Sequence, residues 1–320
     1  MHDPIAAWLA HRPLVILDGA LATELEKRGA NLKDPLWSAK LLIEAPDLIR
    51  AVHLDYFLAG ADVATTATYQ ASFEAFAARG IDASGAARLM REAVGLASSA
   101  RDAFWTDAAA RTGRARPLVA ASIGPYGAML GDGAEYRGGY AADDAALAAF
   151  HRPRLEVLAD SGADLFACET IPSAREALVL ARLMADFPRM SAWISFSCRD
   201  GAHTCEGQRV DVAVAALNEF PQIVAVGVNC SAPGYVASVL ERMRAATIKP
   251  LLAYPNSGER YDAGAKCWLG DATTTSFAAA AQIWYTAGAR LIGGCCRTGP
   301  DDIRAIRASA AGAFGRAAAR

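Results

Sequence analysis

The chain has 320 residues, which is enough for one large α/β domain or two small ones. Hydrophobic residues make up 53% and charged residues 21%, so a sizeable core can form and disorder is not expected. The formal net charge is −2, with both signs spread along the chain. This balance excludes the basic stripe of a nucleic-acid-binding protein and favours small-molecule chemistry.

The N-terminal segment lacks the features of a secretory signal, because its acid comes early and its apolar run covers only Ile5 to Ala10. No segment approaches the roughly 20 apolar residues that span a bilayer. We therefore expect a cytoplasmic protein whose seven cysteines stay reduced. An odd number of cysteines also fits a closed disulfide framework poorly. Reduced cysteines leave three interpretations: core packing, nucleophile or metal ligand.

Eight short apolar runs, each ending in polar or glycine residues, are typical of strands buried on both faces, as in a parallel sheet. In chain order they cover residues 15–18, 63–68, 118–122, 165–169, 193–196, 223–230, 251–254 and 291–294.

Helix signals lie between these runs. A segment that begins at Pro46 has apolar residues at helical spacing and ends at Gly60. Ser173 and Glu176 have the spacing of a capping box, and two acids precede Ile303 in the first turn of another predicted helix. This alternation predicts a single (β/α)8 barrel domain over residues 1–320, with its core at about residues 14–307. An open doubly wound sheet is the rival, but its glycine-rich dinucleotide fingerprint is missing after the first strand.

Two segments depart from the alternation. Residues 124–139 run from Gly124 to Gly139 after the third predicted strand and are rich in glycine and tyrosine. A long ordered loop at the mouth of a barrel often covers or lines a substrate site. Beyond Ala308 the chain is mostly alanine, glycine and arginine, and we expect a frayed end without a function.

Polar residues gather at the ends of the predicted strands, and barrel enzymes build their active sites at that face. These residues are Asp18, Tyr69, Gln70, Glu169, Cys230, Asn256, Cys295 and Cys296.

Three of the cysteines carry the sharpest argument. Cys230 ends the sixth strand and Cys295 and Cys296 end the eighth, so only the seventh strand separates them. Two strand spacings of about 4.8 Å place these ends roughly 10 Å apart. A zinc ion with Zn–S bonds of about 2.3 Å can be reached from both sides, and three thiolates leave one coordination position for a substrate. Adjacent cysteines cannot face the same side of a regular strand, so the strand must break, and the preceding two glycines supply the backbone freedom.

A single free cysteine is most often a buried small hydrophobe, and core or surface positions are the better expectation for Cys168, Cys198, Cys205 and Cys267. The first two lie at strand ends and the other two in predicted loops. A disulfide between adjacent residues is a poor alternative, because adjacent Cα atoms lie about 3.8 Å apart, below the usual range.

Other residues at this face have more than one interpretation. Glu169 is equally suited to cap the following helix, and Asp18 to occupy a turn before Gly19. The turn at Gly293 and Gly294 is also suited to holding phosphate, as late loops in many barrels do. Thiolates would repel a phosphate, so we rank a metal-independent enzyme acting on a phosphate-bearing substrate below the metal site.

The sequence resembles the homocysteine S-methyltransferase family, and within it the S-methylmethionine-dependent bacterial and plant enzymes. The resemblance runs from about Val15 to Ile306. It is carried by the segments 17–25 (LDGALATEL), 69–71 (YQA), 122–127 (SIGPYG), 167–170 (ACET), 228–230 (VNC), 254–259 (YPNSGE) and 292–297 (IGGCCR).

The resemblance implies roles for individual residues. The zinc ligands of the family correspond to Cys230, Cys295 and Cys296, in agreement with the argument from geometry. The acids that hold the homocysteine amine correspond to Asp18 and Glu169. Four further residues are implied to lie near the substrates: Asn229, Tyr126, Tyr136 and Asn256.

The activity implied is methyl transfer from a sulfonium donor to the homocysteine thiol, which forms methionine. S-methylmethionine is the favoured donor and S-adenosylmethionine the second, while betaine ranks below both. The chain has neither a cobalamin or folate module nor the long C-terminal extension with which betaine-using relatives tetramerise, so we expect a monomer. A non-catalytic zinc-binding or thiol-binding protein is a further alternative, which would bind metal without an open coordination position.

Overall fold

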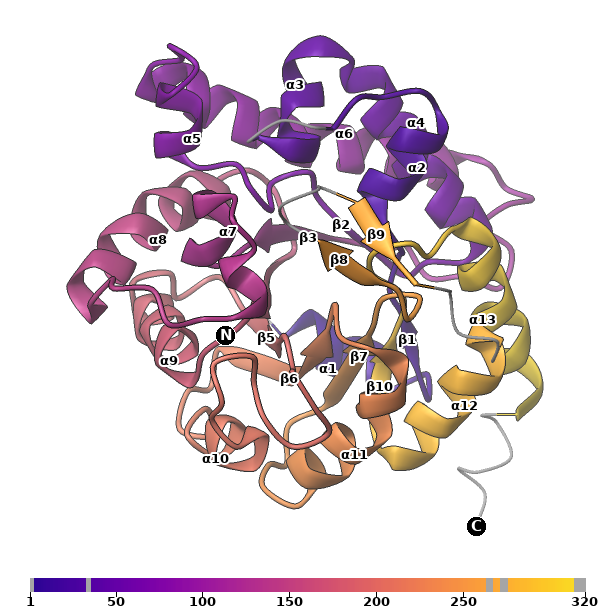
Figure 1. Ribbon diagram of the computed structural model, residues 1–320. Helices are drawn as coiled ribbons and strands as arrows, with labels where there is room; N and C mark the ends of the chain where they lie inside the picture. The colour runs from indigo at the N-terminus through magenta and orange to yellow at the C-terminus, as the bar shows by residue number, and fades with distance from the viewer. Residues whose placement is uncertain (1–2, 33–35, 263–266, 271–275, 314–320) are drawn as a thin grey trace.

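The computed structural model describes residues 3–32, 36–262, 267–270 and 276–313. Eight parallel strands form one sheet in the order β1-β10-β7-β6-β5-β4-β3-β2. A parallel bridge between Leu17 and Val63 joins the two outer strands, so the sheet closes into a barrel. Figure 1 shows the helices arranged around it. The predicted (β/α)8 architecture is therefore confirmed.

The barrel strands coincide with the eight predicted runs to within a few residues. Their bounds are β1 Val15–Ile16, β2 Val63–Thr65, β3 Leu118–Ile123, β4 Leu165–Ile171, β5 Ala192–Phe196, β6 Ile223–Asn229, β7 Leu251–Tyr254 and β10 Ala289–Ile292. The helices are α1 Pro4–Leu9, α2 Leu21–Lys27, η1 Trp37–Lys40, α3 Leu41–Glu44, α4 Pro46–Ala59, α5 Phe73–Ala77, α6 Ala83–Thr106, α7 Tyr126–Leu130, η2 Ala134–Tyr136, α8 Asp144–Ala159, α9 Ala174–Leu183, η3 Met184–Asp186, α10 Val210–Ala215, α11 Pro233–Arg244, α12 Phe277–Ala287 and α13 Pro300–Ala313.

The helix signals act largely as expected. Helix α4 runs from Pro46 to Ala59 and is capped by Gly60, whose φ of 120° few other residues adopt. The Ser173 hydroxyl accepts the Glu176 amide at 3.1 Å and caps α9. The Glu176 side chain does not complete the capping box, because its carboxylate is fully buried and bonded to the loop that follows β3.

Helix α1 closes the N-terminal end of the barrel, which the sequence did not predict. Ile5 and Trp8 pack in one buried cluster with residues near the strand starts, such as Val15, Leu165 and Val224. Apolar side chains from the strands fill the barrel around this plug. The functional chemistry is thereby left to the opposite end, where the strands finish.

Two further elements differ from the sequence-based expectation. A short antiparallel hairpin, β8 Arg260–Asp262 and β9 Cys267–Leu269, lies between β7 and α12 in the chain, so Cys267 is in a strand and not in a loop. Helix α13 continues to Ala313, past the predicted fraying point at Ala308, and residues 314–320 lie outside the described part. Among the described residues, none of the helices has the length and apolar character needed to cross a bilayer.

Candidate active site

Three cysteine sulfurs converge where β6 and β10 end. Cys230 directly follows β6, and Cys295 and Cys296 follow β10 after two glycines. The three Sγ atoms all lie within 4.8 Å of one another, and those of Cys230 and Cys296 are 3.5 Å apart. The sheet order confirms that only β7 separates the two strands. Thiolate sulfur is a preferred ligand of zinc, so this trio is suited to hold that metal.

The two glycines before the cysteine pair are required by close packing. A Cβ at Gly293 would lie 2.6 Å from the Leu17 Cβ, and one at Gly294 would lie 2.2 Å from the Thr298 Oγ1. Neither glycine has a left-handed φ, so the reason for glycine is space and not the backbone freedom that the sequence suggested. The left-handed conformations occur instead at Cys230, with a φ of 46°, and at Arg297, with a φ of 69°.

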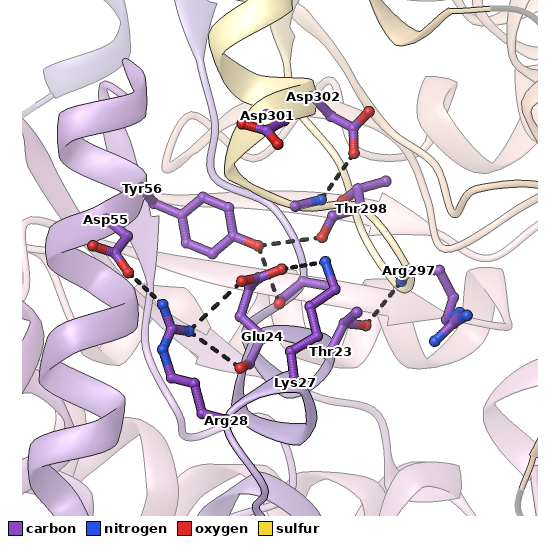
Figure 2. A network of polar contacts seen from close by, with 12 residues as sticks. Thr23, Glu24, Lys27, Arg28, Asp55, Tyr56, Arg297, Thr298, Asp301 and Asp302 are labelled. Carbon is purple, nitrogen blue, oxygen red and sulfur yellow. Dashed lines mark hydrogen bonds and ion pairs between the residues drawn. The ribbon is translucent and has the colours of Figure 1, made fainter.

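The turn after the cysteine pair is bonded to the first βα unit, as Figure 2 shows. The Arg297 amide donates to the Thr23 Oγ1 at 3.0 Å. The Tyr56 hydroxyl lies 3.1 Å from the Ala20 carbonyl and 3.2 Å from the Thr298 carbonyl. Because β1 and β10 are neighbours, these bonds fix the cysteine pair against the segment after β1 that carries Asp18.

Tyr136 reaches the cysteine trio from the loop that follows β3. Its hydroxyl lies 3.2 Å from the Cys230 Sγ, and it lines the cavity at the mouth of the barrel. The short helix η2 holds it there, because the Ser197 hydroxyl donates to the Glu135 carbonyl at 2.7 Å. The segment 124–139 is thus an ordered wall of the site.

Two buried carboxyls lie at the ends of β1 and β4. Asp18 accepts the Thr65 amide at 2.8 Å and the Thr65 hydroxyl at 3.0 Å, while Glu169 accepts the Ser122 hydroxyl. Burial raises the pKa of Asp18 to about 8 and that of Glu169 to about 7. Mutual repulsion adds to the rise for Asp18. The pKa values of both carboxyls are raised because they are buried and no positive group of the described chain lies beside them. The two carboxyls are therefore suited to bind an organic cation.

The other three predicted substrate contacts lie near the cavity without lining it. Asn229 is fully buried and bonds Thr170 twice, accepting its amide at 2.7 Å and donating to its hydroxyl at 2.8 Å. The Tyr126 ring packs against Tyr140 and Phe150, with centroids 5.4 and 5.2 Å away. The Asn256 side chain accepts the Gly258 amide at 3.0 Å within its own turn. Asp18 likewise stands just outside the lining, behind Thr65.

The cavity is acidic. Glu26, Glu135 and Glu169 line it together with the three cysteines, and no lysine, arginine or histidine of the described chain does so. The amides at the glycine turn are also occupied, since those of Gly293 and Gly294 donate to the carbonyls of Ala253 and Asp18. A phosphate would find neither positive charge nor free amides at this turn, so the phosphate-substrate alternative is not favoured.

Sequence reasoning missed several residues of this site. Glu135 lies in the loop that was expected to cover or line the site, but no motif singled out this residue. Ser122, which donates to Glu169, and Tyr254, which lines the cavity, were quoted only within longer segments. Cys168 and Cys198 are buried as expected, and burial raises the pKa of the Cys168 thiol to about 12, so it stays protonated. Cys205 is half-buried.

Comparison with known proteins identifies the family. A sequence model described as homocysteine S-methyltransferase matches residues 15–310. The homocysteine S-methyltransferase YbgG of Bacillus subtilis is 51% identical over 96% of this chain and 97% of its own length. The homocysteine S-methyltransferase of Escherichia coli is 49% identical, with 96% and 98% covered.

A solved structure agrees with the sequence comparisons. The metallated form of the homocysteine methyltransferase MmuM from Escherichia coli superimposes with a TM-score of 0.86 at 47% identity, covering 96% of this chain and 99% of that one. The chain therefore belongs to the homocysteine S-methyltransferase family.

Proposed function

We propose that this enzyme transfers a methyl group from a sulfonium donor, S-methylmethionine before S-adenosylmethionine, to the thiol of homocysteine and so forms methionine. The observation that carries the proposal is the convergence of three cysteine sulfurs at the catalytic end of a barrel of this family. An acidic cavity without basic residues in its described lining supports a cationic donor.

Cys230, Cys295 and Cys296 would hold a zinc ion. Three thiolates match the donor atoms that zinc prefers and leave a position for a fourth ligand, so the residues present fit the metal. When bound, zinc supplies the means to keep the substrate thiol deprotonated at neutral pH, where a free thiol is mostly protonated.

The side chains around the cysteines would bind and align the two substrates. Glu169 lines the cavity and would accept the ammonium group of homocysteine, and Asp18, behind Thr65, would add a second negative charge to hold it. The positive charge of the ammonium offsets the cost of burying both carboxyls. Asn229 holds the backbone of Thr170 next to Glu169, and the Asn256 turn stands beside Cys230, since its amide donates to the Ser231 carbonyl. Tyr136 presents its ring to the cavity, where a cation–π contact would hold the donor. Tyr126 supports the loop that carries Tyr136.

The chemical step needs no general acid. A bond forms between the homocysteine sulfur and the methyl carbon while the bond from that carbon to the donor sulfur breaks. The electron pair returns to the donor sulfur, which leaves as a neutral thioether. The protein's part is alignment and exclusion of water, and positioning alone can supply several kcal/mol of the barrier.

A cytoplasmic location and a monomeric state remain predictions.

The test is zinc content measured together with homocysteine methylation in wild type, Cys230→Ala and Cys205→Ala. We expect about one zinc per chain and methionine formation in wild type and in Cys205→Ala, and loss of both in Cys230→Ala. Cys205 is the matched control because it lies outside the trio and is half-buried. Full activity without metal would refute the zinc site. Zinc binding without methyl transfer would favour a non-catalytic zinc protein, and strong preference for betaine would overturn the choice of donor.

A further inference from the structure

Glu135 is a further acid of the cavity, and the methyl transfer proposed for this enzyme does not use it. Only 8% of the residue is exposed, yet it lines the cavity beside Tyr136. Its Oε2 is buried and has no hydrogen-bond partner among the described residues. Burial raises the pKa of this carboxyl to about 7. An unpaired buried carboxylate is costly, so its presence calls for a ligand that pairs with it.

The backbone holds Glu135 firmly in place. The Ser197 hydroxyl donates to its carbonyl at 2.7 Å. Gly127 lies so close that a Cβ there would be 2.8 Å from the Glu135 amide nitrogen. Further along the loop, the Gly139 amide donates to the Glu206 carboxylate at 2.8 Å. The backbone that carries the Glu135 side chain is therefore a fixed part of the wall, as the support of a preorganised binding group should be.

Gln70 brings a second unsatisfied acceptor to the same cavity. Its Nε2 donates to the Ala128 carbonyl at 2.9 Å in helix α7, which packs on the turn that carries Glu135. This bond fixes the amide, and its Oε1 is left buried without a partner among the described residues. Both open positions, on Glu135 and on Gln70, accept hydrogen bonds, so the ligand that satisfies them must donate.

These facts discriminate between the charged groups of the two substrates. A sulfonium has no N–H and cannot satisfy two acceptors, whereas an ammonium has three donors. The homocysteine ammonium is already assigned to Asp18 and Glu169 at the ends of β1 and β4. Glu135 and Gln70 come from the loops after β3 and β2, and Glu135 neighbours the tyrosine that faces the donor cation.

We propose that Glu135 and the Gln70 Oε1 form the subsite for the ammonium group of an amino-acid methyl donor. The proposal rests on the proposed function, and it makes the enzyme selective for sulfonium donors that carry an α-amino group. The donor would then be held at two points, by its ammonium at Glu135 and by its sulfonium at Tyr136.

The test compares Glu135→Gln with Asp132→Asn, which removes the same charge from the same loop at a residue that does not line the cavity. In Glu135→Gln we expect the KM for S-methylmethionine to rise about tenfold to a hundredfold, as loss of one charge-assisted hydrogen bond implies. The KM for homocysteine should stay within twofold of the wild-type value. Asp132→Asn should change neither. A raised homocysteine KM with an unchanged donor KM would overturn the proposal.

A donor without an amino group separates the two cationic groups. Dimethylsulfoniopropionate carries a sulfonium and a carboxylate but no amino group, and we expect Glu135→Gln and wild type to use it equally poorly. An equal loss with both donors would show that Glu135 faces the sulfonium and would refute the ammonium subsite. Should Glu135→Gln fail to fold by circular dichroism, Glu135→Asp serves instead, with a smaller rise in donor KM expected. If the wild-type enzyme methylates homocysteine with none of the donors, the proposed function is wrong. If the wild-type enzyme turns over normally and Glu135→Gln is unaffected, only the ammonium subsite is wrong.

Discussion

In the described part of the chain, three residues other than glycine adopt left-handed backbone conformations, and each belongs to the cysteine trio, directly follows it or lines the same cavity. They are Thr170, Cys230 and Arg297, with φ values of 60°, 46° and 69°. Each such residue costs about 1–3 kcal/mol and persists only where its surroundings fix it. The Asn229 side chain fixes Thr170 with two hydrogen bonds, and the Cys230 amide is held by the Tyr254 carbonyl at 3.1 Å. The strain is therefore concentrated where side chains must point away from the regular strand direction.

The Asp18 carboxyl gives the free enzyme a distinctive dependence of stability on pH. Its pKa is about 8 in the folded chain against 3.8 for the ordinary side chain, mainly because it is buried. Between these pH values the folded state keeps a proton that the unfolded state has released. The free energy of unfolding therefore falls as pH rises from about 4 to about 8. Asn cannot ionise, so Asp18→Asn removes this contribution.

We predict that the stability difference between Asp18→Asn and wild type changes in favour of the variant as pH rises from 5 to 8. Urea unfolding of both proteins without substrate, at four pH values in that range, measures this difference. The exposed Asp47→Asn is the matched control and should follow the wild-type curve. A constant difference between Asp18→Asn and wild type across the range would show that Asp18 is ionised throughout.

At the scale of residues, the sequence predicts chemistry that lies on strands better than chemistry on loops. Cys230 and Glu169 were located because strand ends share one face of a barrel. Glu135 was missed because its burial depends on contacts that exist only in the folded chain. Ser197 is far away in sequence, and Gly127 approaches Glu135 only because the loop folds back on itself. Tyr126 illustrates the converse: a residue inside a specific motif whose ring supports the loop and does not line the cavity.

The loop after β3 is clamped at both ends by one residue of α9. The buried Glu176 carboxylate accepts the Tyr126 amide at 2.6 Å and the Tyr140 hydroxyl, and it lies 2.8 Å from the His151 Nε2. Tyr126 and Tyr140 flank the segment that carries Glu135 and Tyr136. The carboxylate that in sequence seemed to complete a helix cap thus ties α8, α9 and the loop together.

We predict that Glu176→Ala frees this loop. Each polar partner left buried without a bond costs about 1–3 kcal/mol, so the free energy of unfolding should fall by roughly 3 kcal/mol or more. Methyl transfer should also decrease, because Tyr136 is no longer held beside Cys230, and limited proteolysis should cut within residues 126–140. Glu156→Ala on the exposed face of α8 is the control. It should change the free energy of unfolding by no more than about 0.5 kcal/mol and leave methyl transfer and the proteolysis pattern as in wild type. If the loop of Glu176→Ala resists proteolysis as well as the loop of wild type does, Glu176 does not clamp it.

At the scale of elements, the buried strands could be predicted because near-continuous apolar runs have few other uses. The β8–β9 hairpin could not, since its strands of three residues carry no apolar periodicity. The extension of α13 to Ala313 could have been expected, because alanine is the strongest helix former and a run rich in it favours helix over fraying.

The two ends of the barrel handle charge in opposite ways. At the N-terminal end, the fully buried Asp62 is bonded to Arg114 and Arg307 and accepts the Ile16 amide at 2.9 Å. At the C-terminal end, Asp18 and Glu169 are buried without a basic partner in the described lining of the cavity. The charge at the first end is paired within the fold, and we propose that the acids at the second end pair with the substrates. Stability and substrate recognition are thereby assigned to opposite ends of one barrel.

This division predicts that damage to the plug at the N-terminal end lowers stability and spares the chemistry. Trp8 of α1 is 8% exposed and packs in the cluster that fills the barrel floor. Trp8→Ala should lower the free energy of unfolding by about 3–5 kcal/mol, as for other buried tryptophans. At a temperature where the variant is folded, its zinc content and its KM for homocysteine should equal those of wild type, because the cysteine trio lies at the other end of the strands. Trp105→Ala, on the outer helix α6 and only half-buried, is the control and should cost less stability. Should the homocysteine KM rise in step with the loss of stability, the two faces are coupled through the barrel, and the strands transmit strain from the plug to the site.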